Sequence, residues 1–398
     1  MTGRRFALIA GGGTAGHLQP ALAIAEALVD GGRERTSIGF LGSSRGQDAA
    51  VLADRGFPAD LLPGRGIVRS MAPRALLQNL GALWGLAVAA VRAQAIVRRD
   101  RPQVVVAVGG YASLAGALAA VLQRIPLVLV NIDAVPGAAN RLFGRFASAS
   151  VVGWPGTALP RATVTGTPVR PAVAAVVRTP EARTAARAAL GLPSDGAVVA
   201  AFGGSLGARR INGAVDGLAA ARAGRDDVAV YHIIGRRDWP SYGPDDGAAS
   251  PASPASSASP AGGALPSGSG PVVVRVPYEE RMDLVYAAAD LVVCRAGAMT
   301  VAELAAAGVP AVLVPLPGAP GDHQTANAGV LERAGAAVLL PDPECTGGRL
   351  AEVVDGLLAD PVRLAAMGAA AAAEGRPDAA AAGARVVEAA ARTSRGAA

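Results

Sequence analysis

The sequence predicts an α/β protein made of two parallel-sheet domains in tandem. Its 398 residues exceed the length at which a single hydrophobic core stops growing. Short apolar runs alternate with alanine-rich stretches, a pattern typical of parallel strands joined by helices. Two glycine-rich turns, at residues 11–17 and 203–208, each join a predicted strand to a predicted helix. Because the turns occupy corresponding places in the two halves, they favour a repeated fold.

The N-terminal half opens with an apolar strand that leads directly into the first glycine turn. A glycine pair, Gly109-Gly110, follows a later strand, and Asn131-Ile132-Asp133 follows the next one. The elements expected in this half are, in order, strand 6–10, helix 18–28, strand 36–41, helix 46–55, helix 74–99, strand 104–108 and strand 127–130.

The C-terminal half resumes the alternation at strand 198–202. Residues 243–271 are almost entirely Ala, Ser, Pro and Gly, so they cannot bury enough surface to offset their ordering entropy, and they predict a flexible loop. An apolar strand, 272–276, follows directly, which indicates an insertion within the domain. Further strands are expected at 291–293 and 312–314.

The first half ends near the stretch Thr165-Gly166-Thr167-Pro168-Val169-Arg170. We place an N-terminal domain at residues 1–165 and a C-terminal domain at residues 166–375. A last helix, at about 376–394, is expected to pack back on the N-terminal domain.

The composition excludes several classes of function. All 37 basic residues are arginine, so Walker-type phosphate loops and Schiff-base chemistry, which need a lysine amine, are excluded. The net charge of +6 favours anionic partners, but the arginines are dispersed and aromatic residues make up only 4%, so we expect no nucleic-acid binding. Cys294 and Cys345 predict buried, reduced thiols. No pair of histidines has metal-ligand spacing, so we expect no metal cofactor.

The chain shows no pattern of a membrane span or a leader segment. No uninterrupted apolar run reaches the ~18 residues that a spanning helix needs. The first residues lead directly into the first strand, which leaves no room for a signal peptide. We therefore expect the protein in the cytoplasm.

Both glycine turns present backbone N–H groups at a helix N-terminus, where an anion is favoured. His17 directly follows the first turn, where its imidazole could act as a general base near neutral pH; a capping or packing role is the alternative. His323 lies in a polar loop with Gln324. His232 lies in an apolar strand and is expected to be structural.

A second candidate site begins at Arg295, directly after an apolar strand. Small residues there place backbone N–H groups at a helix start, which suits a diphosphate. Glu303, one turn further on, could accept hydrogen bonds from both hydroxyls of a ribose. The alternative is an ordinary solvated helix residue. Gln324 would reach the same crevice, at the carboxyl ends of parallel strands.

Taken in order, these motifs resemble the MurG family of peptidoglycan glycosyltransferases over nearly the whole chain. That family moves N-acetylglucosamine from UDP-N-acetylglucosamine (UDP-GlcNAc) to lipid-linked N-acetylmuramoyl-pentapeptide. The motifs are Gly12-Gly13-Thr14-x-Gly16-His17, Gly109-Gly110-Tyr111, the stretch 165–170, Gly203-Gly204-Ser205-x-Gly207-Ala208-Arg209, Arg295-x-Gly297-Ala298-x-Thr300-x-x-Glu303, and His323-Gln324-x-x-Asn327-Ala328.

The resemblance implies a GT-B architecture, in which two Rossmann-like domains with parallel sheets face a cleft. The C-terminal domain would bind UDP-GlcNAc and the N-terminal domain undecaprenyl-linked lipid I, with no cofactor. His17 and Asp133 would be the catalytic candidates. The substrate-binding residues implied are Thr14, Ala15, Gly16, Tyr111, Asp133, Arg170, Ser205, Asn212, Ala298, Met299, Thr300, Val301, Ala302, Glu303 and Gln324.

One segment departs from the family pattern. Where the family commonly has His-Glu-x-Asn, this chain has Val130-Asn131-Ile132-Asp133, and Leu206 replaces a usual Gln. Asp133 aligns with the Asn, but the His and Glu are absent. This leaves open a paralogue that glycosylates another lipid or metabolite. The glycine turns alone would also fit a dinucleotide-dependent oxidoreductase or a non-catalytic sugar-nucleotide binder, although an acidic residue after strand 36–41 is missing.

Residues 65–84 mix arginines with large apolar side chains, a composition suited to an anionic membrane surface. A core helix with a solvated loop is the alternative. The lipid substrate implied by the resemblance favours a peripheral position on the cytoplasmic leaflet of the cell membrane.

Overall fold

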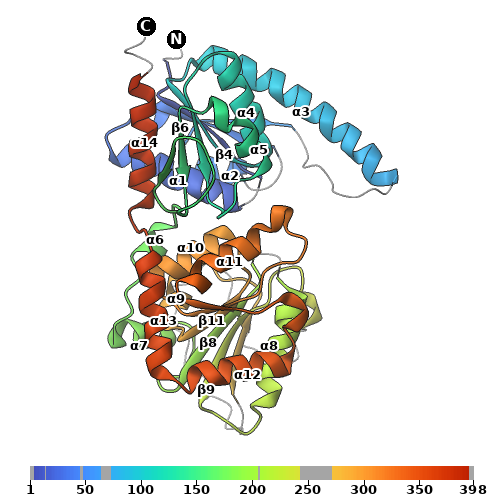
Figure 1. Cartoon of the computed structure of the whole chain (residues 1–398), viewed down its shortest axis with the longest axis vertical. Helices are drawn as coiled ribbons and strands as arrows, with labels where there is room; N and C mark the ends of the chain where they lie inside the picture. The colour runs from blue at the N-terminus through green and yellow to red at the C-terminus, as the bar shows by residue number, and fades with distance from the viewer. Residues whose placement is uncertain are drawn as a thin grey trace. The chain divides into compact units, whose positions relative to one another are not determined.

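The computed structural model describes residues 4–13, 15–44, 48–63, 73–204, 207–242 and 271–393, with the backbone alone at residues 15, 73–83 and 393 (Figure 1). Thr14, Ser205 and all but the last residue of the predicted insertion lie outside these ranges. The chain forms two compact units, Met1–Pro171 with Arg376–Ala398, and Ala172–Gly375. The first division falls six residues beyond the predicted boundary, and the C-terminal helix belongs to the N-terminal unit.

The N-terminal unit is built on a seven-stranded parallel sheet with strand order β3-β2-β1-β4-β5-β6-β7. Its strands are β1 (Ala7–Gly11), β2 (Ile38–Ser43), β3 (Ala59–Leu62), β4 (Val104–Gly109), β5 (Leu127–Asn131), β6 (Ala149–Val152) and β7 (Ala162–Val164). Its helices are α1 (Ala15–Asp30), α2 (Asp48–Asp54), α3 (Pro73–Asp100), α4 (Gly110–Leu122), α5 (Ala138–Phe143) and α14 (Ala379–Thr393).

Helices cover both faces of this sheet, so its central strands are apolar throughout. Every residue of β1 is buried. Helices α3 and α4 cover one face of the sheet, where their side chains form a core cluster with residues of β1, β4 and β5. On the other face α14 lies beside α1, and Gly383 of α14 faces Ile24 and Val151 (Figure 1).

The C-terminal unit has a six-stranded parallel sheet with strand order β10-β9-β8-β11-β12-β13. Its strands are β8 (Ala197–Phe202), β9 (Val228–Ile233), β10 (Val272–Val276), β11 (Leu291–Cys294), β12 (Ala311–Leu313) and β13 (Ala337–Leu339). Its helices are α7 (Pro180–Ala189), α8 (Arg209–Ala221), α9 (Met282–Ala288), α10 (Ala298–Ala307), α11 (His323–Arg333), α12 (Gly347–Leu358) and α13 (Pro361–Glu374); the short α6 (Pro171–Ala174) lies at the division between the units.

One hydrophobic core cluster of the C-terminal unit lies between the sheet and helices α8, α12 and α13, and it includes Ile211, Leu218 and Val354. Cys294 and Cys345 are buried free thiols, as predicted, and burial raises the pKa of Cys345 to about 11. Among the described residues, no helix combines the length and apolar character that a membrane crossing requires.

Candidate active site

In both sheets the strand order reverses direction between two neighbouring strands. The reversal lies between β1 and β4 in the N-terminal unit and between β8 and β11 in the C-terminal unit. Connections leave such a pair of strands toward opposite faces, which opens a crevice at the carboxyl edge where ligands of open α/β sheets bind. The two glycine turns follow β1 and β8, so both lie at these crevices.

The register of the C-terminal sheet brings three predicted segments to one edge. Cys294 at the end of β11 lies opposite Phe202 of β8 and Leu313 of β12. The residues that follow these strands are the second glycine turn, the segment that starts at Arg295, and the loop that leads to Gln324. The structure therefore places the three segments at one carboxyl edge.

A cavity of about 1140 Å³ opens at this edge. Glycines of the second turn and the N-terminus of α8 line one part of it, and four arginines contribute cationic groups. Its lining residues are Gly203, Gly204, Gly207, Ala208, Arg209, Arg210, Gly213, Ala214, Arg237, Arg295, Leu316, Pro317, Gln324, Asp342, Cys345, Thr346 and Gly347. Guanidinium groups beside a helix N-terminus suit an anionic ligand.

The arginines of the cavity differ in how firmly they are held. Arg295 pairs with Asp342 at 2.6 Å and donates to the carbonyls of Val314 and Pro315, both at 3.1 Å. Arg209 is 84% exposed, at 3.4 Å from Asp238. Asp238 is buried, and its hydrogen bonds with Arg237 and Arg209 lower its pKa. Arg295 is thus part of the wall, whereas Arg209 extends into solvent.

Gln324 is held with its amide nitrogen available. Its Oε1 accepts a hydrogen bond from the backbone N–H of Leu316 at 2.9 Å. Among the residues that the structure describes, its Nε2 has no recorded partner, so a donor remains at the cavity. This orientation suits the predicted contact between Gln324 and a sugar.

The helix start after Arg295 forms as predicted, with Gly297 as the N-cap of α10. Glu303 is only 6% exposed, and its Oε2 accepts a hydrogen bond from the hydroxyl of the fully buried Tyr286 at 2.9 Å. The alternative of a solvated helix residue is therefore wrong for Glu303. Met299 and Thr300 are half-buried, and residues 298 and 301–302 are buried. Residues 298–303 do not contribute to the lining of the arginine-rich cavity.

The first glycine turn differs from the second because a side chain of the protein occupies it. The buried Asp48, at the start of α2, accepts hydrogen bonds through Oδ2 from the N–H groups of Gly13 at 2.7 Å and Ser43 at 2.9 Å. A Cβ atom at Gly12 would collide with this carboxylate. The expectation that both turns receive an external anion is therefore wrong for the Gly13 N–H. Asp48 was not predicted from the sequence, because its only local signal is that of an acidic residue shortly after a strand.

His17 lies at the same edge of the N-terminal sheet, one turn into α1. A Cβ atom at Gly109 would lie 2.7 Å from His17 Nε2, so the ring packs directly against the turn after β4. Gly109 has a φ of 127°, a conformation that favours glycine. The two glycine motifs thus meet around this imidazole.

The described parts of the chain contain no cluster of three or more His, Cys, Asp or Glu side chains that could hold a metal ion. Positive charge around the C-terminal cavity comes instead from its arginines and from the N-terminus of α8.

The two halves of the sequence match the two domains of one glycosyltransferase family. The glycosyltransferase family 28 N-terminal domain matches residues 7–152, and the glycosyltransferase family 28 C-terminal domain matches residues 198–382. The chain belongs to glycosyltransferase family 28.

Curated relatives of this family 28 glycosyltransferase share one name, UDP-N-acetylglucosamine–N-acetylmuramyl-(pentapeptide) pyrophosphoryl-undecaprenol N-acetylglucosamine transferase. The protein from Rhodococcus opacus (strain B4) is 39% identical over 400 residues, which cover 96% of this chain and 94% of the relative. The protein from Nocardioides sp. (strain ATCC BAA-499 / JS614) is 41% identical over 366 residues, with 92% and 93% covered. These matches confirm the resemblance, and the oxidoreductase alternative is wrong.

Solved structures agree with this assignment. The crystal structure of Acinetobacter baumannii MurG superposes with a TM-score of 0.73 at 26% identity, covering 97% of this chain and 99% of that one. The glycosyltransferase of kitacinnamycin superposes with a TM-score of 0.63 at 19% identity, covering 98% and 100%, which supports the fold alone. The predicted fold class, α/β of the GT-B type with two parallel-sheet domains, is confirmed.

The departure at residues 130–133 has a structural explanation in this family 28 enzyme. Asn131 is buried, and its Nδ2 donates to the carbonyl of Asp133 at 2.7 Å. Its Oδ1 accepts from Asn140 Nδ2 at 3.0 Å and from the Gly137 N–H at 3.3 Å. Asn131 therefore holds the loop after β5, and Val130 is buried as well. Asp133 is half-buried, at the same edge of the sheet as His17.

Tyr111 and Asn212 are engaged within their own units. The Tyr111 hydroxyl contacts the carbonyls of Pro63 and Gly85, which connects α4 to α3 and to the loop after β3. The buried Asn212 donates through Nδ2 to the Ile234 carbonyl at 3.1 Å. Arg170, which is half-buried, lies at the end of the N-terminal unit. Substrate roles for these three residues stay predictions.

His232 has a structural position, and it makes stability depend on pH. The ring is fully buried, and its Nε2 lies 3.1 Å from Asn212 Oδ1, where a neutral imidazole donates. Burial lowers the pKa of His232 from 6.5 to about 4. Below pH 6.5 the unfolded chain therefore binds a proton that the folded chain does not bind. The free energy of unfolding is unaffected by His232 above that pH, and we expect it to fall by up to about 1.4 kcal/mol per pH unit between pH 6.5 and pH 4.

Urea unfolding at pH 7, 6 and 5 measures this dependence. Because carboxylates also titrate at the lower end, the His232 contribution is the difference between the protein and a His232→Gln variant. We expect the variant to lose less stability between pH 7 and pH 5. Equal losses in the two proteins would contradict the assignment.

Proposed function

We propose that this chain is the inverting glycosyltransferase that moves GlcNAc from UDP-GlcNAc to the C4 hydroxyl of undecaprenyl-diphospho-N-acetylmuramoyl-pentapeptide, lipid I, and forms lipid II for peptidoglycan synthesis. The observation that carries the proposal is the arginine-lined cavity at the second glycine turn, in a chain with family 28 domains over both halves. The shared name of the curated relatives supports this donor and this acceptor.

In the proposed reaction, a base takes the proton of the acceptor C4 hydroxyl as its oxygen attacks the anomeric carbon of GlcNAc. The bond between that carbon and the diphosphate oxygen breaks, and its electron pair leaves with UDP. Charge develops on the leaving diphosphate, so fixed positive groups accelerate the step. Arg209 and the N–H groups at the start of α8 are placed at the cavity to supply them.

The base is proposed to be His17, with Asp133 as the second candidate. Neutral imidazole is an effective base near pH 7. The packing of His17 against Gly109 fixes the ring at the carboxyl edge of the N-terminal sheet. Tyr286 is proposed as a positioning residue, because its hydroxyl orients the Glu303 carboxylate that would bind the ribose.

The deciding experiment incubates the purified protein with labelled UDP-GlcNAc and a short-chain lipid I analogue, without added metal. The expected product is labelled disaccharide-lipid with release of UDP. If donor binding is intact but no labelled lipid forms, this function is wrong.

A second candidate function is a family 28 enzyme that glycosylates a different lipid or metabolite. Val130 and Asn131, which stand in place of the family His and Glu, favour it. The two candidates are separated by offering labelled UDP-GlcNAc with alternative polyprenyl-phosphate or hydroxylated acceptors. An enzyme with the second function transfers the label to one of these acceptors and not to lipid I.

A lipid acceptor lies in the membrane, so the enzyme must bind to its cytoplasmic leaflet. We propose that α3 makes this contact. Trp84 is 74% exposed and Val91 is 71% exposed. With Ala87 and Ala95, which are also exposed, they follow a helical spacing of three and four residues along one face. Arg92 is exposed next to this face. The first turns of α3 extend past the rest of the N-terminal unit (Figure 1). The predicted basic-apolar segment before residue 73 lies outside the described residues.

A charged residue on this face should weaken membrane binding. Burial of a large apolar side chain contributes about 1.5–3 kcal/mol, so we expect Trp84→Glu to lower affinity for vesicles with an anionic phospholipid by about tenfold or more. Vesicle sedimentation measures the bound fraction. Val91→Glu should act in the same direction, whereas Val362→Glu, at an 81% exposed position of α13, is the matched control. Equal losses in Val91→Glu and Val362→Glu would contradict the assignment.

A further inference from the structure

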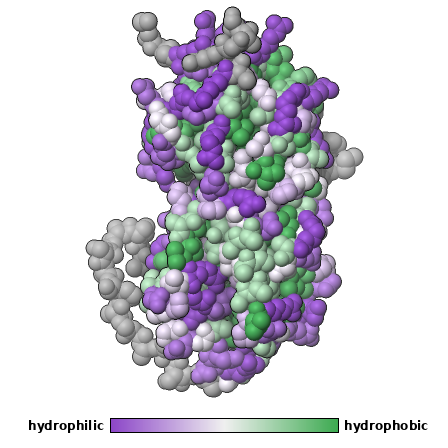
Figure 2. All heavy atoms as spheres, turned by 60° about the vertical axis from the view of Figure 1, so that its left-hand side comes forward, coloured by the Kyte–Doolittle hydropathy of each residue, from purple (hydrophilic) through white to green (hydrophobic). Residues whose placement is uncertain are grey.

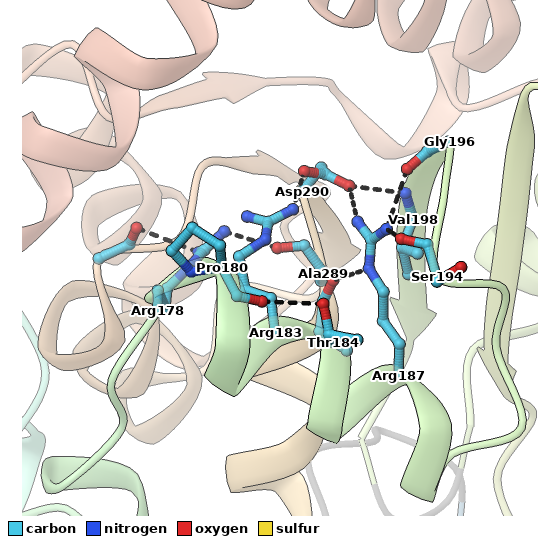
Figure 3. A network of polar contacts seen from close by, with 12 residues as sticks. Arg178, Pro180, Arg183, Thr184, Arg187, Ser194, Gly196, Val198, Ala289 and Asp290 are labelled. Carbon is cyan, nitrogen blue, oxygen red and sulfur yellow. Dashed lines mark hydrogen bonds and ion pairs between the residues drawn. The ribbon is translucent and has the colours of Figure 1, made fainter.

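A second cationic cluster lies at the amino edge of the C-terminal sheet, where β8 and β11 begin. Arg178, Arg183 and Arg187, from α7 and the segment before it, gather around Asp290, the residue before β11 (Figure 3). The second glycine turn and the cavity beside it follow the carboxyl ends of the same strands. The cluster is therefore separate from the proposed donor site.

Both carboxylate oxygens of Asp290 are engaged within the protein. Its Oδ1 pairs with Arg183, and its Oδ2 accepts from Arg187 Nη2 at 2.8 Å and from the Val198 N–H at 2.7 Å. Asp195 adds a second negative charge that acts on Arg187. Two carboxylates thus face three guanidinium groups, so the cluster keeps an excess of positive charge.

Arg187 is the structural member of the cluster. Its side chain is 7% exposed. It donates to the carbonyls of Ser194 at 2.7 Å, Gly196 at 3.1 Å and Ala288 at 3.3 Å, in addition to its Asp290 pair. These contacts fasten α7 to the edge of the sheet (Figure 3). Most hydrogen-bond donors of Arg187 are therefore used within the protein and are not available to a ligand.

Arg178 and Arg183 have donors to spare. Arg178 donates to the carbonyls of Ala289 at 2.6 Å and Gly308 at 3.2 Å, and pairs with no carboxylate among the described residues. Burial, with Arg183 close by, lowers the pKa of Arg178 to about 10, so the group is still a cation at pH 7. Within the described ranges, Asp290 is the only recorded polar partner of the Arg183 side chain.

These two arginines line a cavity of about 500 Å³. Most of its other lining residues are apolar and come mainly from α13, with Pro361, Leu364, Ala365 and Ala372. Figure 2, in which the left-hand side of Figure 1 comes forward, shows hydrophilic residues beside a broad area of moderately hydrophobic ones. The arginines can thus bind a charged group of a ligand, and the residues of α13 can contact its apolar part.

We propose that this cavity is a second, anion-binding site, in which Arg178 and Arg183 hold a phosphate or carboxylate group and the α13 wall contacts the apolar part of the ligand. Guanidinium groups match the geometry of such oxyanions, and an added anion offsets the repulsion among the three arginines. The site uses residues of one unit only and does not depend on the proposed function.

Inorganic phosphate is the probe, titrated against chloride at constant ionic strength and followed by thermal unfolding and calorimetry. We expect phosphate to raise the Tm, and Arg183→Gln to weaken its binding about tenfold, because the variant loses a charge-assisted hydrogen bond to the anion. Arg225→Gln, at an exposed arginine that pairs with Asp227, is the matched control. Arg209→Gln reports on phosphate bound in the donor-side cavity instead.

Ala365→Glu tests the site without relying on the loss of an arginine. The new carboxylate at the cavity wall should raise the Tm in chloride and abolish the phosphate effect. No phosphate effect on the unaltered protein would overturn the proposal. So would an effect that survives in Arg183→Gln, or one that disappears only in Arg209→Gln.

Discussion

Replacement of His17 by alanine is expected to lower turnover by about 10²–10⁴-fold, the usual contribution of a general base, while the KM for UDP-GlcNAc changes by about twofold or less. The small effect on KM is expected because His17 and the donor-side groups lie on different units. The imidazole lies on the N-terminal unit, packed on Gly109, whereas the arginine-lined cavity, Glu303 and Gln324 lie on the C-terminal unit. Removal of the ring therefore leaves these donor-side groups intact.

Transfer of labelled GlcNAc to the lipid I analogue gives the kcat and KM of each variant. Gly109→Ala is a partner variant, because its added Cβ collides with the ring and should also lower turnover. Asp133→Asn tests the alternative base. If His17→Ala keeps full turnover while Asp133→Asn loses it, the base is Asp133. In the variant that removes the true base, the decline of kcat at acidic pH should disappear.

Replacement of Glu303 by alanine is expected to raise the KM for UDP-GlcNAc about 100-fold. A carboxylate that accepts both ribose hydroxyls makes two charge-assisted hydrogen bonds, each worth about 1.5–3 kcal/mol. Because the Glu303 side chain is buried and held by Tyr286, it needs little reordering when the ribose arrives. Steady-state kinetics with varied UDP-GlcNAc, and titration with UDP, measure the loss.

Two variants separate ribose binding from a general loss of stability. Tyr286→Phe keeps the ring and the carboxylate but removes the hydrogen bond between them, so we expect a smaller rise in KM, about three- to tenfold. Glu352→Gln removes a carboxylate that is 69% exposed on α12 and should leave KM unchanged. If Glu303→Ala lowers the Tm but not the affinity for UDP, Glu303 serves the fold and not the ribose.

The central strands and the longest helix were readable from the sequence. Strands buried on both faces are continuous apolar runs, so β1, β4, β5 and β8 were predicted within a residue or two at each end. The helix predicted at 74–99 is α3, Pro73–Asp100. Among the strands at the sheet margins, β10 was predicted at its observed bounds, whereas β3 and β7 were not predicted. β3 and β7 are short and carry exposed residues, so they lack a distinct apolar run.

The candidate site was predicted where a single segment carries the signal. The glycine turns, the start of α10 and Gln324 were found because backbone N–H groups at a helix N-terminus are a local property. Asp48, Arg237 and Tyr286 were missed. Asp48 and Tyr286 act on partners that only the folded chain brings close, the Gly13 N–H and the Glu303 carboxylate. Arg237 pairs with the adjacent Asp238, and only the fold places it at the cavity.

The sequence by itself determined two parallel-sheet domains, each with a glycine turn at the end of a central strand, because short-range patterns encode strands and turns. Only the tertiary structure decided what each turn does. The first turn gives the Gly13 N–H to Asp48, which lies 35 residues further along the chain. The second turn opens into the arginine-lined cavity. The physical reason is that a turn accepts or excludes an external anion according to the charge that distant segments place beside it.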